Sequence, residues 1–287
     1  MGKIKVRKWM RGQLFIKYEI GHGMSKHQIK NNHNATPYIH SNKTYKTYLA
    51  QCNHFADWLT KKGITDPEKA WEMVPEYLKS LEDANKSAWT ISTAMNAIAK
   101  AWGVSTSEIA YKAPERERAS IKRSRYTVER DSHFSVAANK ELVAFCCATG
   151  LRRSELESLH GTDMMYGDNN RILLCVTGKG GKTRTVDVIG SPCEVGIVEK
   201  AMLRARDGLV FEHIHSALDV HYYRSLYACR AYKSKARDID TLVTSEKYVC
   251  RKDKAGTVYD RKAMEYASKQ LGHTRIDVIA YSYLHNL

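Results

Sequence analysis

Residues 113–130 divide the chain into two parts. This stretch, "APERERASIKRSRYTVER", is dense in charge, contains Pro114 and has almost no large apolar side chain. Such a composition contributes little to a hydrophobic core and predicts an exposed linker, although the solvated face of a charged helix would look similar. A chain of 287 residues is long enough for two domains, each with its own core. We therefore expect two domains joined by a basic linker.

Residues 36–112 show helical periodicity. In "KTYKTYLAQCNHFADWLTKKG" the apolar side chains recur three and four positions apart, and Gly63 follows as a stop signal. "DPEKAWEMVPEYLKSLED" opens with an Asp cap and a proline, and "SAWTISTAMNAIAKAWG" closes on Gly103. These patterns predict a small helical domain. Residues 1–35 are basic, His-rich and weakly periodic, and predict an N-terminal extension.

Residues 131–287 have the pattern of a second domain. "NKELVAFCCATGLRRSELESL" predicts a helix, a glycine break and a second helix start. "RILLCVTGKGGKTRTVDVI" is rich in β-formers on both sides of a glycine cluster, which is typical of a β-hairpin. The remainder, from "SPCEVGIVEKAML" onward, is mainly helical in pattern. The predicted fold class is mainly α with a small β-sheet.

The net charge indicates an acidic partner. The formal charge is +15 and the sequence pI is about 9.4, so nucleic acid is the first candidate. The sequence has no run of about 18 apolar residues and no signal peptide pattern, so we expect a cytoplasmic protein with no membrane partner. Seven scattered cysteines without a CxxC spacing favour reduced thiols over disulfides or zinc. No metal or other cofactor is expected.

The glycine cluster "TGKGGKT" must be compared with a phosphate-binding P-loop. That motif requires glycine at a position held here by Val176, and no helix follows the cluster. A nucleotide site is therefore rejected. The predicted turn instead presents Lys179, Lys182 and Arg184, which suit contacts with nucleic acid.

Three further segments place polar side chains in apolar surroundings. Any one such Arg or His is more often an ordinary surface or core residue, so only the combination is informative. The segments and their residues are "ATGLRRSEL" with Arg152, Arg153 and Glu155, "DVHYYRSL" with His221 and Arg224, and "LGHTRIDVIAYSYLH" with His273 and two tyrosines.

In their order along the chain, these motifs resemble the signature of the tyrosine recombinases, the family of phage and mobile-element integrases. "TGLRRSEL" matches the family's TGLRxSEL with Arg152 as the catalytic arginine, and "GKGGKTR" matches its hairpin motif with Lys179 as the lysine. His221 and Arg224 match the family's H-x-x-R, and His273 matches its LGH. The resemblance is strongest in the second domain. The preceding helical domain, residues 36–112, looks like the family's core-binding domain, and this resemblance implies that it binds DNA.

The tyrosine is ambiguous, because Ser282 holds the position where the family's nucleophile usually lies, with Tyr281 and Tyr283 on either side. Two residues apart on a helix means about 200° apart, so only one tyrosine can face the site. Ile276, Ile279 and Tyr283 form one stripe that must face the domain, and "YLH" is similar to the family's Tyr-x-His ending. The pattern favours Tyr283, with Tyr281 as the alternative.

The resemblance implies phosphoryl transfer without a metal. A tyrosine attacks a DNA phosphodiester and forms a 3′-phosphotyrosine, while Arg152 and Arg224 bind the nonbridging oxygens. His273 adds a hydrogen bond to the phosphate. His221 accepts the phenolic proton, and Lys179 protonates the departing 5′ oxygen.

The resemblance also implies partners and a setting. A homo-tetramer on two paired double-stranded DNA recombination sites would integrate or excise a phage or mobile element in the bacterial nucleoid, with accessory DNA-bending or directionality proteins as further partners. Residues 1–35 would contact accessory DNA or a neighbouring protomer, or form an unstructured tail. The alternatives are DNA relaxation of the type IB topoisomerase kind and a non-catalytic DNA-binding factor.

Overall fold

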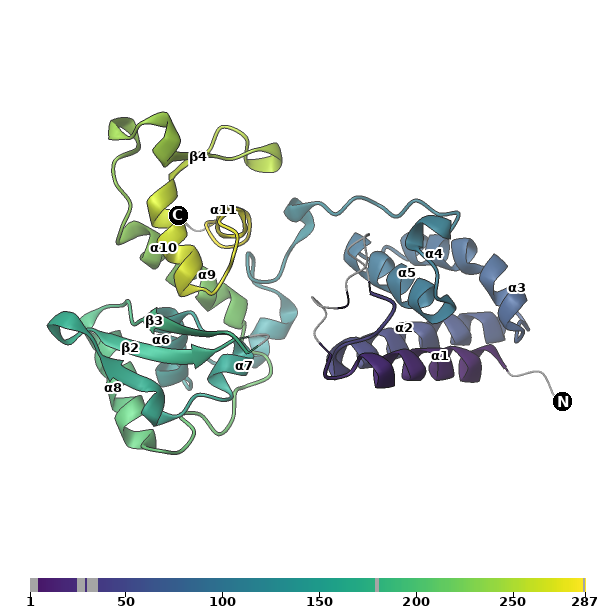
Figure 1. Ribbon diagram of the computed structural model, residues 1–287, viewed down its shortest axis with the longest axis horizontal. Coiled ribbons are helices and arrows are strands. Elements are labelled where there is room, and N and C mark those ends of the chain that lie inside the picture. The colour runs from purple at the N-terminus through teal and green to yellow at the C-terminus, as the bar shows by residue number, and fades with distance from the viewer. Residues whose placement is uncertain (1–4, 25–28, 30–35, 179–180, 286) are drawn as a thin grey trace. The chain divides into compact units, whose positions relative to one another are not determined.

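The chain forms two compact units, Met1–Glu117 and Arg118–Leu287. The computed structural model describes residues 5–24, 29, 36–178, 181–285 and 287. Each unit has its own hydrophobic core. The predicted fold class is confirmed, because the described residues are mainly helical with two small antiparallel sheets (Figure 1). In the described part of the chain, no helix combines the length and apolarity that a membrane span requires.

Local capping signals set the helix boundaries of the first unit. The Ser41 and Ser87 side chains accept hydrogen bonds from backbone N–H groups at the starts of α2 and α5, and Asp66 does the same for α3, where Pro67 follows. Gly103 ends α5 with a left-handed φ of 79°. The helices are α1 (Val6–Gly21), α2 (Asn42–Lys61), α3 (Pro67–Glu72), α4 (Val74–Asp83) and α5 (Ala88–Trp102).

Helix α1 belongs to the core of the first unit. Its buried residues Val6, Met10 and Leu14 recur every four positions, and the helix packs against α2 and α5. Figure 1 shows α1 and α2 side by side. The expectation that residues 1–35 form an extension is therefore wrong for α1. The apolar stripe is narrow and interrupted by basic residues, which is why its periodicity was weak in the sequence.

The second unit combines a three-stranded sheet with helices. Helix α9 packs against both α6 and α10, and α10 also contacts β3 (Figure 1). Its elements are α6 (Lys140–Thr149), α7 (Arg153–Leu156), β1 (Met164–Tyr166), β2 (Ile172–Thr177), β3 (Thr183–Asp187), α8 (Pro192–Ala205), α9 (Val220–Lys233), β4 (Lys247–Val249), β5 (Val258–Asp260), α10 (Arg261–Gln270) and α11 (Asp277–Ser282).

The predicted hairpin is β2–β3. The two strands pair antiparallel with Leu174 opposite Val186 and Val176 opposite Arg184, and β1 pairs with the other edge of β2. Alternate residues of β2 are buried, so one face of the sheet lies on the core. Residues 179–180 of the turn, including Lys179, lie outside the described residues.

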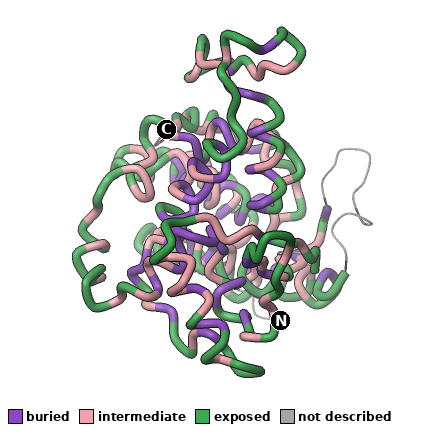
Figure 2. Tube along the Cα trace, turned by 90° about the vertical axis from the view of Figure 1, so that its left-hand side faces the viewer, coloured by how far each residue is buried: buried purple, intermediate pink, exposed green. Residues whose placement is uncertain are grey.

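The core of the second unit fixes the turn that follows α6. Gly150 ends this helix with a φ of 57°, and a Cβ at this position would lie 2.4 Å from the ring of Tyr227. Glycine is therefore required both for its backbone conformation and for space. Figure 2 shows buried residues recurring between exposed ones along the chain. The close packing at Gly150 determines where Arg152 lies.

The predicted linker is attached to the second unit from residue 118 onward. Arg123 donates a hydrogen bond to the Ala217 carbonyl (3.1 Å), Ser124 to the Asp219 carboxylate (2.8 Å) and Arg125 to the Tyr281 carbonyl (3.2 Å). The boundary between the units falls after Glu117. The basic side chains that predicted exposure are instead partly used to bind carbonyls and a carboxylate.

Strands β4 and β5 form a separate hairpin that the sequence did not predict. Each strand has only three residues, too few for an alternating pattern to be recognised. Asp260, at the end of β5, is fully buried, binds Arg237 and accepts hydrogen bonds from the first N–H groups of α10. Hydrogen bonds from Arg237 hold the pKa of this carboxyl well below its usual range. The hairpin is thereby fixed at the start of α10.

Candidate active site

Tyr283 lies at the centre of a polar cluster in the second unit. Its hydroxyl oxygen is 3.2 Å from Nε of Arg224 and 3.3 Å from Nε2 of His273. Arg224 comes from the first turns of α9, His273 follows α10, and Tyr283 follows α11. The fold therefore brings together three of the predicted site residues that are far apart in the sequence.

Arg224 is fixed by backbone carbonyls. The side chain is almost completely buried, and its Nη1 and Nη2 donate to the carbonyls of Gly150 and Leu271. Burial lowers the pKa of its guanidinium below the usual value. Because these partners are neutral, the positive charge of Arg224 remains available to an anion.

Arg152 lies beside Arg224 and shares a partner with it. Its Nη2 donates to the same Leu271 carbonyl at 3.1 Å, and its Nη1 donates to Oε1 of Glu155 at 2.6 Å. The side chain is half-buried, so part of the guanidinium faces solvent. The shared carbonyl oxygen holds the two guanidinium groups close together, and neighbouring guanidinium groups can bind the oxygens of one phosphate.

The Glu155 carboxylate, itself bound by Arg184, holds Arg152 in place. The Glu155 side chain is 1% exposed and accepts two hydrogen bonds of 2.8 Å from Arg184 and one of 2.8 Å from the Arg152 backbone. Burial opposes ionisation of this carboxyl, but the hydrogen bonds from Arg184 and Arg152 prevail and lower its pKa to about 2. Glu155 is therefore an ionised anchor at neutral pH.

The buried position of Arg184 differs from the sequence prediction. Its Nε donates to the Gln270 carbonyl at 2.9 Å, and its side chain is only 11% exposed. The predicted turn presented Arg184 to nucleic acid, whereas the structure uses it to join β3 to Glu155. The signal was the two-residue alternation, because Arg184 shares a strand face with buried Val186.

His273 is a half-buried, neutral neighbour of the arginines. Its Nε2 lies 3.5 Å from Nη2 of Arg224. Desolvation, followed by the charges of Arg224 and Arg152, lowers the pKa of His273 to about 4. At neutral pH this imidazole therefore acts as an uncharged hydrogen-bonding group.

His221 and Lys179 are placed less directly. The ring centroid of His221 lies 6.4 Å from that of Tyr283, and the imidazole is exposed. Partial desolvation and the charge of Arg224 lower the pKa of His221. Lys179 falls outside the described residues, but the hairpin leading to it is placed, because Gly178 packs against Glu155.

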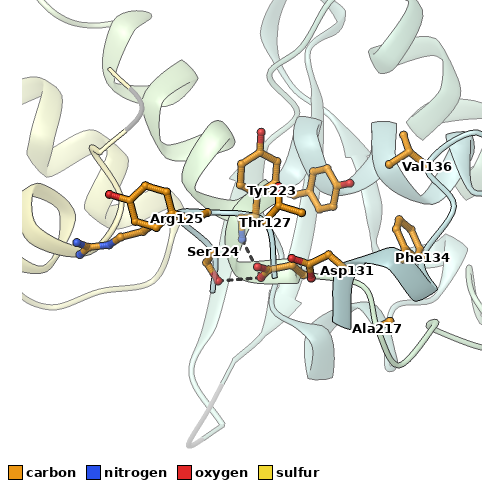
Figure 3. A pocket seen from close by; sticks show the side chains of 11 residues that line it. Ser124, Arg125, Thr127, Asp131, Phe134, Val136, Ala217 and Tyr223 are labelled. Atoms are coloured by element: carbon orange, nitrogen blue, oxygen red, sulfur yellow. Dashed lines mark hydrogen bonds between the residues drawn. The ribbon is translucent and has the colours of Figure 1, made fainter. Parts of the chain in front are cut away.

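The start of α9 is held by residues 118–134, which form the first part of the second unit. Asp219 caps α9 through the Tyr222 N–H (3.1 Å) and accepts the hydroxyl of Ser124. A cavity of about 560 Å³ opens there, with Asp131, Phe134 and further residues of both segments in its walls (Figure 3). These contacts fix the turn of α9 that carries His221.

Tyr281 points away from the cluster. Its hydroxyl accepts a hydrogen bond from the Arg251 N–H and donates one to the Arg251 carbonyl, both at 2.7 Å. The guanidinium of Arg118 lies 4.5 Å from the centre of its ring. The two candidate tyrosines therefore have different surroundings: Tyr283 faces the arginines and Tyr281 faces the β4–β5 hairpin.

The hairpin also holds the segment that carries Tyr283. Nζ of Lys254 donates to the carbonyls of Ala280 (2.7 Å) and Leu284 (3.0 Å), and the Tyr259 hydroxyl donates to Leu284 (3.4 Å). Desolvation lowers the pKa of Lys254. A cation that binds the last carbonyls of a helix is favourably placed in the field of the helix.

Among the described residues, no group of three or more His, Cys, Asp and Glu side chains is arranged to hold a metal ion.

We predict a characteristic titration of His273. Its folded-state pKa of about 4 lies below the unfolded value near 6.5, so protons bind preferentially to the unfolded chain between these pH values. The contribution of this group to stability should therefore fall as pH drops from about 6.5 to about 4. NMR titration measures the midpoint directly. A midpoint above about 6 for the resonance that disappears in His273→Gln would contradict the assignment.

Comparisons with known proteins identify the fold. No family model matches the sequence, and no curated protein matches it. Solved structures do: the XerH site-specific recombinase bound to difH before cleavage is 14% identical with a TM-score of 0.56, covering 99% of this chain and 95% of its own. The XerH post-cleavage complex on palindromic difH is 14% identical with a TM-score of 0.53, covering 97% of this chain and 91% of its own. The Tn1549 transposon integrase with transposon right-end DNA is 10% identical with a TM-score of 0.50, covering 99% of this chain and 96% of its own.

These likenesses show that the chain has the tyrosine recombinase fold. The coverage includes both units, so the likeness is not confined to the second one. The fold that the motif resemblance implied is therefore confirmed. XerH and the Tn1549 integrase are two proteins whose architecture this chain shares.

Proposed function

We propose that this protein is a site-specific DNA recombinase that cleaves and rejoins DNA strands through a 3′-phosphotyrosine on Tyr283. The observation that carries the proposal is the placement of the Tyr283 hydroxyl within 3.3 Å of both Arg224 and His273. A phenol beside the guanidinium of Arg224, which is held by neutral carbonyls, is suited to attack a phosphodiester, because this group can bind the charge of the transition state.

Each side chain of the cluster then has a role. Oη of Tyr283 attacks phosphorus while the bond from phosphorus to the 5′ oxygen breaks, and His221 accepts the phenolic proton. Arg152 and Arg224 bind the nonbridging oxygens, and neutral His273 adds a hydrogen bond. Lys179 protonates the departing 5′ oxygen.

Glu155 orients arginines and does not transfer protons. Its pKa of about 2 keeps it ionised at neutral pH, so it has no proton to give and little basicity. Its two partners, Arg152 and Arg184, are held at hydrogen-bond distance from one carboxylate. This anchor preorganises Arg152 for the phosphate.

The cycle proposed for the whole protein is an exchange between two duplexes. The phosphotyrosine bond retains the energy of the phosphodiester, so the 5′-hydroxyl of another strand can reverse the attack without ATP. A homo-tetramer on two paired sites would integrate or excise a mobile element or phage, assisted by accessory DNA-bending or directionality proteins. XerH bound to difH and the Tn1549 integrase bound to transposon end DNA share the fold and support this proposal. The formal charge of +15 favours a polyanion as the partner.

The decisive experiment is covalent trapping. A DNA site from the flanks of the gene is nicked beside the scissile phosphate, so that the short 5′-hydroxyl strand diffuses away after attack. The wild-type protein should migrate with the DNA on a denaturing gel. If several flanking sites give no such product, the enzymatic proposal is wrong. Relaxation of a supercoiled plasmid that lacks these sites would favour topoisomerase activity instead.

We predict that Lys254 positions the nucleophile without contacting DNA. Lys254→Met keeps the aliphatic stem and removes both hydrogen bonds to the Tyr283 segment. Because small displacements of a reacting group are costly, the single-turnover rate at saturating DNA should fall about 10- to 100-fold while Kd stays unchanged. Lys254→Arg retains a donor and should recover part of the rate. Equal rates for wild type and Lys254→Met would exclude this role.

A further inference from the structure

A basic pocket lies between the β4–β5 hairpin and α11. It has a volume of about 690 Å³, and we call it the hairpin pocket. Its charged lining consists of five cations and a single carboxylate: Arg118, Lys247, Arg251, Lys252, Arg261 and Asp277. In Figure 1 the hairpin lies next to α11. None of these cations has a role in the mechanism proposed above.

Two of these cations and the carboxylate are committed to other groups. Arg118 pairs with Asp253 at 3.1 Å, and Arg261 donates to backbone carbonyls including that of Ser245 at 3.2 Å. Asp277 pairs at 3.1 Å with Arg275, which is not part of the lining. The carboxylate in the pocket is therefore already occupied.

The other three cations lack a counterion. Within the described residues, the side chains of Lys247, Arg251 and Lys252 have no carboxylate at ion-pair distance. By contrast, Arg237 at the base of the same hairpin binds both Asp260 and Glu246. The hairpin therefore neutralises the charge at its base and leaves the charge in the pocket unpaired. Like charges that share a pocket repel each other, and a bound anion removes that cost.

The backbone conformation at Lys252 determines the position of one of these cations. Lys252 has a φ of 57°, in the left-handed region that residues other than glycine adopt only at a cost in free energy. The neighbouring Arg251 is fixed through its N–H and carbonyl by the Tyr281 hydroxyl. The Tyr281 hydroxyl therefore fixes the turn that places the adjacent cations Arg251 and Lys252 in the lining of the same pocket.

The hairpin pocket continues toward the candidate active site. A second hollow of about 230 Å³ shares Arg118 and Tyr281 with it and extends to His221. Arg125, whose side chain donates to backbone carbonyls, also lines this second hollow, as does Arg123, which lies 3.8 Å from the carboxylates of both Asp131 and Asp219. A basic surface therefore leads from the hairpin to the helix turn beside Arg224.

We propose that the hairpin pocket binds backbone phosphates of the DNA duplex that the active site cleaves. The inference rests on the proposed function, because it assigns the pocket to the same substrate. Guanidinium and ammonium donors at the end of a basic surface fit a row of phosphodiesters better than a single small anion. Lys247, Arg251 and Lys252 are the binding residues, and they contribute affinity rather than chemistry.

The test measures the salt dependence of DNA binding. The triple variant Lys247→Gln, Arg251→Gln, Lys252→Gln is compared with Lys140→Gln, Lys200→Gln, Lys233→Gln, which removes the same charge from exposed lysines on α6, α8 and α9. Because the pocket variant removes cations that would each neutralise a phosphate, the slope of log K against log salt should fall by roughly 2 to 3, and Kd should rise roughly 100-fold at physiological salt. Unchanged thermal unfolding confirms that the folds are intact.

The outcomes separate the pocket from the proposed function. If the two triple variants have the same slope and Kd, the pocket assignment is overturned while cleavage by wild type stands. If the pocket variant alone loses affinity but wild type forms no covalent complex, the recombinase proposal fails and the pocket stands. Inorganic phosphate at constant ionic strength should not displace the duplex. Displacement from wild type but not from the pocket variant would identify a free-phosphate site and overturn the DNA assignment.

Discussion

Tyr283→Phe is expected to abolish the covalent protein–DNA complex, whereas Tyr281→Phe should retain it. Phenylalanine removes the hydroxyl that lies within hydrogen-bond distance of both Arg224 and His273, so the proposed nucleophile is lost. The Tyr281 hydroxyl is instead bonded to the Arg251 backbone, on the hairpin side of α11. Denaturing gels of both variants with a nicked substrate make the comparison directly.

The thermal stability and the DNA affinity of both variants serve as controls for this prediction. Each substitution removes one hydroxyl, which should change the free energy of unfolding by about 1 kcal/mol. Tyr283→Phe should therefore bind the duplex like wild type, whereas Tyr281→Phe, which releases the Arg251 backbone in the hairpin pocket, should bind it somewhat more weakly and is compared at saturating DNA. A covalent complex formed by Tyr283→Phe and lost in Tyr281→Phe would show that Tyr281 is the nucleophile and that α11 must rotate on DNA.

Arg152→Gln should have the second largest effect on cleavage. The half-buried guanidinium of Arg152 is the more accessible of the two that share the Leu271 carbonyl. Removing one charged donor from a transition-state site typically costs about 100- to 1,000-fold in rate. We expect this loss in single-turnover cleavage at saturating DNA, with a smaller change in Kd.

Arg153→Gln provides the matched control for Arg152→Gln. The side chain of Arg153 donates to the carbonyls of Ile214 (3.1 Å), His215 (3.0 Å) and Leu218 (3.0 Å), away from Tyr283. This variant should unfold at a lower temperature but cleave at the wild-type rate. If Arg153→Gln loses as much rate as Arg152→Gln, loss of stability rather than loss of a phosphate donor explains both.

The sequence was informative where function depends on short motifs. Arg224 and His273 could be named because their motifs have fixed local spacing, and the β2–β3 hairpin followed from its alternating pattern. The structure then placed both residues against Tyr283, the tyrosine that the apolar stripe favoured. Their catalytic roles remain predictions that the substitutions above will test.

The parts that could not be predicted depend on contacts between distant segments. Glu155 and Arg184 are 29 positions apart, and although the alternation in β3 indicates that Arg184 faces the core, nothing local identifies Glu155 as its partner. Helix α1 was not predicted as part of the domain, because its narrow apolar stripe can be recognised as a core face only from its packing against α2 and α5. The β4–β5 hairpin was missed because three-residue strands have no readable period.

The carbonyl of Leu271 has a consequence for how such sites are compared between proteins. It receives both Arg152 and Arg224, and Gly272, with a φ of 65°, makes the turn that follows. Because the acceptor is a backbone atom, no exchange of the Leu271 side chain removes it. The spacing of the two guanidinium groups is therefore set by main-chain geometry as well as by the Glu155 side chain, and an inventory of side chains alone will undercount the positions that specify the site.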